Sequence, residues 1–289
     1  MDFKNAAELL LLCETHLCPV SEIMKRRECS LAETTPEMLD GRMLQVLRIM
    51  RNAATEPVQA PRRSMGGLIG GEARLIDLHR REGKSICGNP LSRAIAYATA
   101  VLEVNSSMGL IVAAPTAGSS GVVPGVLLSL QEEYGLPDQA ILPALYHSSA
   151  IGYLAMRNAT VSGAVGGCQA EVGVASAMAA GAAVELMGGT PKQCLDGAST
   201  ALMNLLGLVC DPVGGLVEYP CQNRNAVGVA NALTAAELAL SGVKQLIPFD
   251  EMLAAMYNVG HRLSPDFKET AMGGCAVTPS GCAACQSCR

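Results

Sequence analysis

Aromatic side chains are scarce in this sequence: only 3% of its 289 residues are aromatic, and none is tryptophan. Charged residues are also sparse, at 16%, whereas hydrophobic residues make up 49% of the chain. This composition excludes an intrinsically disordered chain, which would be rich in charge and poor in apolar residues. Without aromatic residues the core must be filled by alanine, leucine, valine and methionine, and this favours close helix packing. We therefore predict an all-α fold of Ala- and Gly-rich helices.

An excess of positive charge is absent as well, since the net charge is −5. Nucleic acid is therefore not expected as a partner, because phosphates call for a basic surface. The first five residues contain no basic region or cleavage site of a secretory signal, and we expect a cytoplasmic protein. Residues 104–131 carry no charge, but Asn105, Pro115 and Pro124 would be costly in lipid, so we expect buried protein interior and no membrane span.

Cysteine, in contrast, is abundant, with 12 residues. In a reducing compartment this number favours metal ligands or catalytic thiols over a disulfide framework. Cys168, Cys210 and Cys221 are separated by 41 and 10 residues and lie in glycine- and proline-rich segments that we expect to form loops. Cys168 directly precedes a predicted helix, where free amides favour a thiolate. The three thiols could share a metal site, although each could also be a small buried hydrophobe.

Apolar periodicity predicts a succession of helices with Gly- and polar-rich loops between them. The stretch 18–35 is expected to be irregular. We divide the chain into an N-terminal helical segment (1–60), a catalytic domain (61–274) and a Cys-rich tail (275–289). The predicted helices cover residues 5–17, 36–53, 72–81, 92–104, 121–134, 138–156, 170–187, 191–206, 224–241 and 249–261.

The tail contains Cys275, Cys282, Cys285 and Cys288. Three of them have the spacing that begins a bacterial ferredoxin motif, but the remainder of that motif does not follow. These thiols could hold a metal of their own, supply one further ligand to the main site, or remain free and reactive.

Several segments together resemble the iron-sulfur-dependent L-serine dehydratases, in the same order along roughly residues 60–280. The segments are 114–124 (APTAGSSGVVP), 162–164 (SGA), 167–173 (GCQAEVG), 206–213 (LGLVCDPV), 220–226 (PCQNRNA), 268–270 (KET) and 273–274 (GG). Single-chain members of that family carry a further domain before this region. The chain is therefore similar to the alpha subunit of the two-subunit form, and the resemblance implies a beta subunit as partner.

The resemblance also implies a cofactor and a reaction. Cys168, Cys210 and Cys221 would hold three irons of a 4Fe-4S cluster, and the fourth iron would be open to act as a Lewis acid on L-serine. The products would be pyruvate and ammonia, formed without pyridoxal phosphate. In single-chain relatives a cysteine near the C-terminus caps the fourth iron when substrate is absent, and Cys282 lies at about the matching place.

Candidate substrate contacts come from two of these segments. Hydroxyls and free amides before a helix form an anion site, so Thr116, Ser119 and Ser120 are candidates for binding the substrate carboxylate. Asn223 and Arg224 either position the substrate or support Cys221.

No general base is evident in the resembling segments. In the family the base is expected to be a histidine of a Ser-Ser-His segment in the beta-type domain, so we expect it on the partner subunit. Two other functions stay open: a related L-cysteine desulfidase acting as a single chain, and a non-catalytic iron-sulfur electron carrier or sensor. The four histidines, none within a resembling segment, are His16, His79, His147 and His261.

Overall fold

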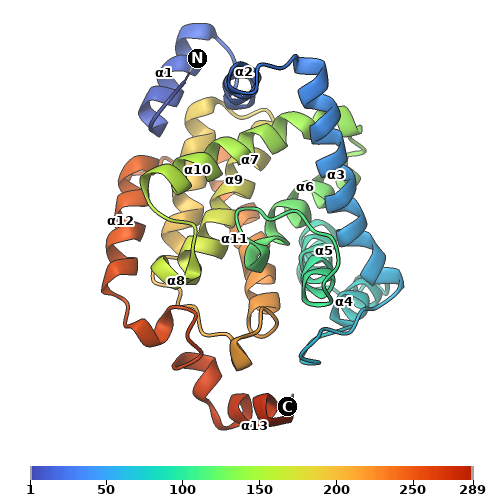
Figure 1. Ribbon diagram of the computed structural model, residues 1–289. Coiled ribbons are helices and arrows are strands. Elements are labelled where there is room, and N and C mark those ends of the chain that lie inside the picture. The colour runs from blue at the N-terminus through green and yellow to red at the C-terminus, as the bar shows by residue number, and fades with distance from the viewer. Residues whose placement is uncertain (1, 288–289) are drawn as a thin grey trace.

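The computed structural model describes residues 2–287 and consists of helices joined by loops (Figure 1). Within this range no strand forms, and the only extended pairing is an isolated parallel bridge between Cys210 and Lys268. The prediction of an all-α fold is therefore confirmed. The α-helices are α1 (Ala6–His16), α2 (Val20–Leu31), α3 (Pro36–Gln59), α4 (Glu72–Arg81), α5 (Gly88–Ser106), α6 (Val122–Tyr134), α7 (Asp138–Asn158), α8 (Gly163–Gly166), α9 (Val174–Leu186), α10 (Pro191–Asn204), α11 (Cys221–Leu240), α12 (Phe249–Arg262) and α13 (Pro279–Ser287).

Short helical turns lie between several of these helices. The π-helix η2 (Gln169–Gly173) leads directly into α9, and the others are 3₁₀ turns. The 3₁₀ turns are η1 (Ala117–Ser119), η3 (Val213–Gly215), η4 (Pro265–Phe267) and η5 (Gly274–Val277).

Helix α2 shows that the expectation of an irregular segment at 18–35 was wrong. Its buried residues Val20, Ile23, Met24 and Arg27 recur at helical spacing, and the helix packs against α7. The guanidinium of Arg27 lies 3.9 Å from the centroid of the Tyr153 ring. An arginine that stacks on an aromatic ring can belong to the buried face of a helix. Because the sequence pattern treats arginine as polar, the apolar period of α2 was not recognised.

Two other helices also extend beyond the prediction. Helix α3 continues to Gln59, past the expected end near residue 53, and contains Pro57 within its last turn. The tail, for which no helix was predicted, forms α13 from Pro279 to Ser287.

Helix α9 occupies the centre of the molecule (Figure 1). All of its residues from Val174 to Val184 are buried, and it contacts α6, α7, α10 and α11. A helix that is apolar on every side must be enclosed by others. Its alanines and Gly181 let the neighbouring helices approach closely, which explains how a core can form with so few aromatic residues.

None of the helices within residues 2–287 is both long and apolar enough to cross a membrane. The uncharged stretch 104–131 instead supplies the end of α5, the loop with η1, and most of α6, whose residues Val122 to Gln131 are buried.

The close contact between α5 and α6 gives a stability prediction. A Cβ added at Gly125 in α6 would lie 2.8 Å from the Ala94 carbonyl oxygen of α5, whereas one at Gly41 in α3 would meet nothing within 4 Å. Gly125→Ala should lower the free energy of unfolding by about 1–3 kcal/mol through overpacking. Gly41→Ala should raise it by roughly 0.5–1 kcal/mol, because alanine has the higher helix propensity. Chemical denaturation measures both, and equal effects of the two changes would contradict this account of the helix contact.

Candidate active site

The cysteines of the predicted cluster lie at two helix starts and in one loop. Cys168 directly precedes η2, and Cys221 is the first residue of α11 rather than a loop residue as expected. Cys210 is held by the segment after α12, because its amide donates to the Phe267 carbonyl (2.9 Å) and its carbonyl accepts from the Glu269 amide (3.0 Å). The chain thus returns from its C-terminal part to fix this cysteine.

The three thiols lie close enough for their charges to interact. Burial is the main cause that raises the pKa of Cys168 and that of Cys221 to about 12, and the charge of Cys168 contributes to the rise at Cys221. The pKa of Cys210 is also raised, first by burial and then by Glu171 and the other two cysteines. The expectation that the following helix favours a thiolate at Cys168 is therefore not met, because desolvation outweighs the helix terminus. A metal must displace these protons to bind.

Gly163 packs directly against two residues of the site. A Cβ at Gly163 would lie 3.2 Å from Cys210 Sγ and 2.6 Å from Glu171 Oε2, so only glycine fits here. Among the described residues, the three sulfurs do not all lie within 4.8 Å of one another, a spacing wider than a single ion needs. Three cysteine thiols held apart in this way suit a polynuclear iron-sulfur cluster, and the donor set fits that group.

Glu171 is a site residue to which the sequence analysis assigned no role. Its carboxylate accepts a hydrogen bond from Thr116 Oγ1 (2.8 Å), and Cys210 Sγ lies 3.9 Å away. Burial raises the pKa of Glu171, so the carboxyl group is held toward its neutral form. It lies three residues after Cys168, and this short spacing was the available signal in the sequence.

The hydroxyl-rich loop before α6 has one partly exposed hydroxyl and two buried ones. Thr116 is half-buried, whereas Ser119 and Ser120 are fully buried. Ser119 Oγ lies 3.1 Å from Thr116 Oγ1, and Ser120 Oγ donates to the Ala117 carbonyl (2.8 Å). The structure therefore directs Thr116 toward Glu171 and uses both serines within the loop itself.

Asn225 joins this loop to the start of α11. Its side chain is fully buried, accepts a hydrogen bond from the Gly121 amide (3.0 Å), and donates to the carbonyls of Gly118 (2.8 Å) and Cys221 (2.9 Å). One amide side chain thus fixes the position of Cys221 relative to the hydroxyl-rich loop.

Arg224 and Asn223 have different surroundings. Arg224 donates to the Val209 carbonyl (2.7 Å) and pairs with Asp211 (2.6 Å), and its charge lowers the pKa of Cys168 against the effect of burial. Asn223 is exposed. The structure therefore places Arg224 among the groups that support the thiols, and Asn223 at the surface beside them.

The tail thiols differ in their contacts with this site. Cys282 is exposed on α13, with its Sγ 3.7 Å from the Ala276 carbonyl oxygen. The Cys275 amide donates to Asp211 (2.6 Å), the carboxylate that pairs with Arg224, and its thiol also contacts Asp211. Cys285 lies against Gly214, and Cys288 falls outside the described residues.

None of the four histidines is among the groups that shift the pKa values of the three thiols. His147 is buried between α7 and α9, and the other three are exposed in α1, α4 and α12.

An all-α domain that brings together two buried thiols, one half-buried thiol, a carboxyl group and a hydroxyl has the features of a thiol-lined enzyme site. The chain belongs to the family described as serine dehydratase alpha chain, which matches residues 15–276.

Two similar proteins cover almost the whole chain. The "Probable L-serine dehydratase, alpha chain" of Bacillus subtilis is 43% identical over 279 residues, covering 96% of this chain and 93% of that protein. The "L-serine dehydratase, alpha chain" of Peptoniphilus asaccharolyticus is 42% identical over 277 residues, covering 96% and 95%. The "L-serine dehydratase" of Helicobacter pylori is 38% identical, and the match covers 96% of this chain but 62% of that longer protein.

The buried position of Asn225 gives a second stability prediction. Asn225→Ala would leave the Gly121 amide without its acceptor and should lower the free energy of unfolding by about 1–3 kcal/mol. Asn223→Ala, two positions away at the surface, should change it by no more than about 0.5 kcal/mol. Urea denaturation of both variants measures the difference. If the two substitutions had the same small effect, Asn225 would not be holding the loop.

Proposed function

We propose that this chain is the alpha subunit of an L-serine ammonia-lyase, which converts L-serine to pyruvate and ammonia together with a beta subunit. The observation that carries the proposal is the convergence of Cys168, Cys210 and Cys221 beside Glu171 and Thr116, in a chain of the serine dehydratase alpha chain family. The abundance of free thiols and the need to keep a cluster reduced support a cytoplasmic location.

Cys168, Cys210 and Cys221 would hold a 4Fe-4S cluster, which supplies a Lewis acid for the departure of the substrate hydroxyl group. The charge of Arg224 beside Cys168 compensates part of the negative charge that these thiolates acquire when they lose their protons. A tail thiol, with Cys282 as the residue predicted from the sequence, would serve as the fourth ligand in the absence of substrate. To do so, Cys282 must turn away from the Ala276 carbonyl.

The chain's own residues bind and orient the substrate in this proposal. The Thr116 hydroxyl and the amides at the start of η1 face the substrate carboxylate, and buried Ser119 and Ser120 keep the loop in shape. Glu171 orients Thr116 and excludes water from the space beside Cys210. Asn223 contributes from the rim of the site.

The reaction removes the α proton and the β hydroxyl group of serine as water. The resulting enamine tautomerises to an imine, and water hydrolyses the imine to pyruvate and ammonia. The α proton needs a base, and the histidines of this chain do not surround the thiols. The proposal therefore assigns the base to the beta subunit.

Removal of one thiol tests the ligand set. After anaerobic reconstitution with the beta subunit, Cys210→Ser should lose bound iron and pyruvate formation from L-serine, because an alcohol is a much weaker iron ligand than a thiolate. Cys87→Ser, which changes an exposed cysteine, should keep both. Iron analysis and a pyruvate assay make the comparison. Full iron content and activity in Cys210→Ser would exclude this residue as a ligand.

A second test concerns the origin of the base. The reconstituted chain alone should form pyruvate at no more than about 1% of the rate seen with the beta subunit, in keeping with the 10²–10⁴-fold contribution of general acid–base catalysis. Equal turnover by the isolated chain would contradict the assignment to the partner. Release of sulfide from L-cysteine, without pyruvate from L-serine, would instead indicate a desulfidase.

A further inference from the structure

A second group of metal-ligating side chains lies inside the helical bundle, apart from the three-cysteine site. His147 of α7, Glu185 of α9 and Cys194 of α10 each offer one ligand atom, and these atoms all lie within 4.8 Å of one another. His147 and Cys194 are both 0% exposed. Within residues 2–287 this is the one set of three such groups that is close enough to share an ion.

The group contains buried polar atoms without partners. His147 Nδ1 and Glu185 Oε2 are 2.7 Å apart, and the Ser21 amide donates to the same Glu185 oxygen (3.3 Å). His147 Nε2 and Glu185 Oε1 are buried without any hydrogen-bond partner. Because such unpaired atoms destabilise a protein interior, each calls for an explanation, and a bound ion is one of the usual ones.

The neighbouring backbone is adapted to the imidazole ring. A Cβ at Gly181 of α9 would lie 2.6 Å from His147 Nε2 and 3.2 Å from the Cys194 carbonyl oxygen. Glycine at this position therefore allows the ring to lie between α9 and α10. A hydrophobic side chain would fill the same space without leaving polar atoms unpaired.

We propose that His147, Glu185 and Cys194 bind a divalent transition-metal ion of the zinc class. Imidazole, carboxylate and thiolate are the three donor types that proteins use for Zn²⁺. A tetrahedral ion with bonds of about 2.0 Å to nitrogen and oxygen holds these ligand atoms about 3.3 Å apart, which is within the 4.8 Å that spans the group. It would clamp α7, α9 and α10 together and would serve stability rather than dehydration.

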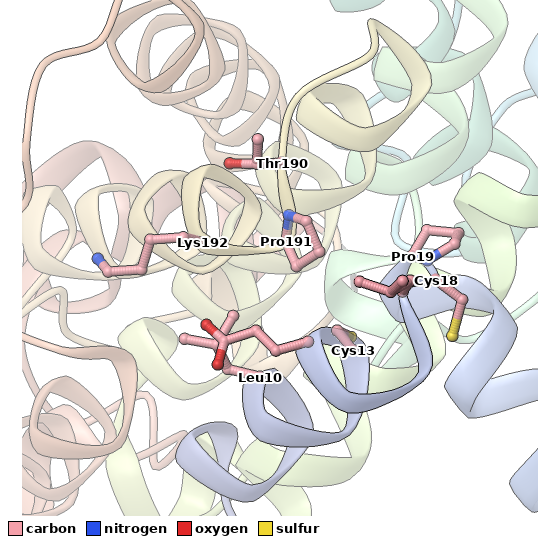
Figure 2. A pocket seen from close by; sticks show the side chains of 9 residues that line it. Leu10, Cys13, Cys18, Pro19, Thr190, Pro191 and Lys192 are labelled. Carbon is pink, nitrogen blue, oxygen red and sulfur yellow. The ribbon is translucent and has the colours of Figure 1, made fainter.

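A solvent-open pocket of about 510 Å³ is lined by Glu185 itself, together with Pro19, Ser21 and Gly189. One ligand of the proposed site therefore borders a pocket that is open to the surface. A second pocket of about 480 Å³, shown in Figure 2, is lined by Cys13 of α1 and Pro191 of α10 but by none of the three ligands.

The test uses the full-length chain with its iron-sulfur site reconstituted, to which one equivalent of Zn²⁺ is added before gel filtration. X-ray absorption at the zinc edge should show a mixed shell of nitrogen or oxygen with sulfur. Zinc at vacant sites of the three-cysteine centre would instead show a shell dominated by sulfur. The same preparation with Co²⁺ should show thiolate-to-cobalt absorption and the intense visible bands of tetrahedral Co²⁺.

Cys194→Ser and His147→Gln should lower retained zinc at least tenfold, whereas Cys87→Ser, at the surface, should retain one equivalent. Circular dichroism checks that each variant is folded. The X-ray absorption measurement uses the unsubstituted chain, so it does not depend on whether a variant folds. Failure of the unsubstituted chain to retain zinc, a sulfur-only shell, or full retention by folded Cys194→Ser would overturn the proposal. These readouts do not involve serine turnover, so they are separate from the test of the lyase function.

Discussion

The convergence of three largely buried thiols beside one carboxyl group is the constraint on which the rest of the site depends. Desolvation raises the pKa values of Cys168, Cys210 and Cys221, so each keeps its proton until a metal displaces it. The Arg224 guanidinium beside Cys168 acts in the opposite direction. Thiols in this balance stay protonated in the absence of a metal and can lose their protons when a metal binds. This suits a site that assembles a metal group after folding.

The small residues of α9 make this convergence possible. Because α9 is buried on every side among α6, α7, α10 and α11, the loops at the ends of these helices lie close together. Asn225 then ties the hydroxyl-rich loop to Cys221, and the bridge to Lys268 fixes Cys210. Scarcity of aromatic residues and abundance of alanine thus follow from the same requirement for close helix contacts.

The sequence predicted the helical class and most helices, because their apolar residues recur with a clear period. It failed at α2, where Arg27 lies on the buried face against Tyr153. It identified the segment containing Glu171 but not the contact with Thr116, which only the fold brings about. His147, Glu185 and Cys194 lie on three different helices and form no motif, so their proximity could be seen only in three dimensions.

The central claim is that the three-cysteine site holds a cluster to which the substrate binds directly. Mössbauer spectroscopy of the ⁵⁷Fe-reconstituted alpha–beta complex, recorded with and without L-serine under anaerobic conditions, tests it most directly. The account predicts that the signal of one iron changes on addition of L-serine while the other three, held by Cys168, Cys210 and Cys221, stay as they were. A spectrum that L-serine leaves unaltered, in a complex shown to bind it, would contradict the account and indicate an electron carrier or sensor.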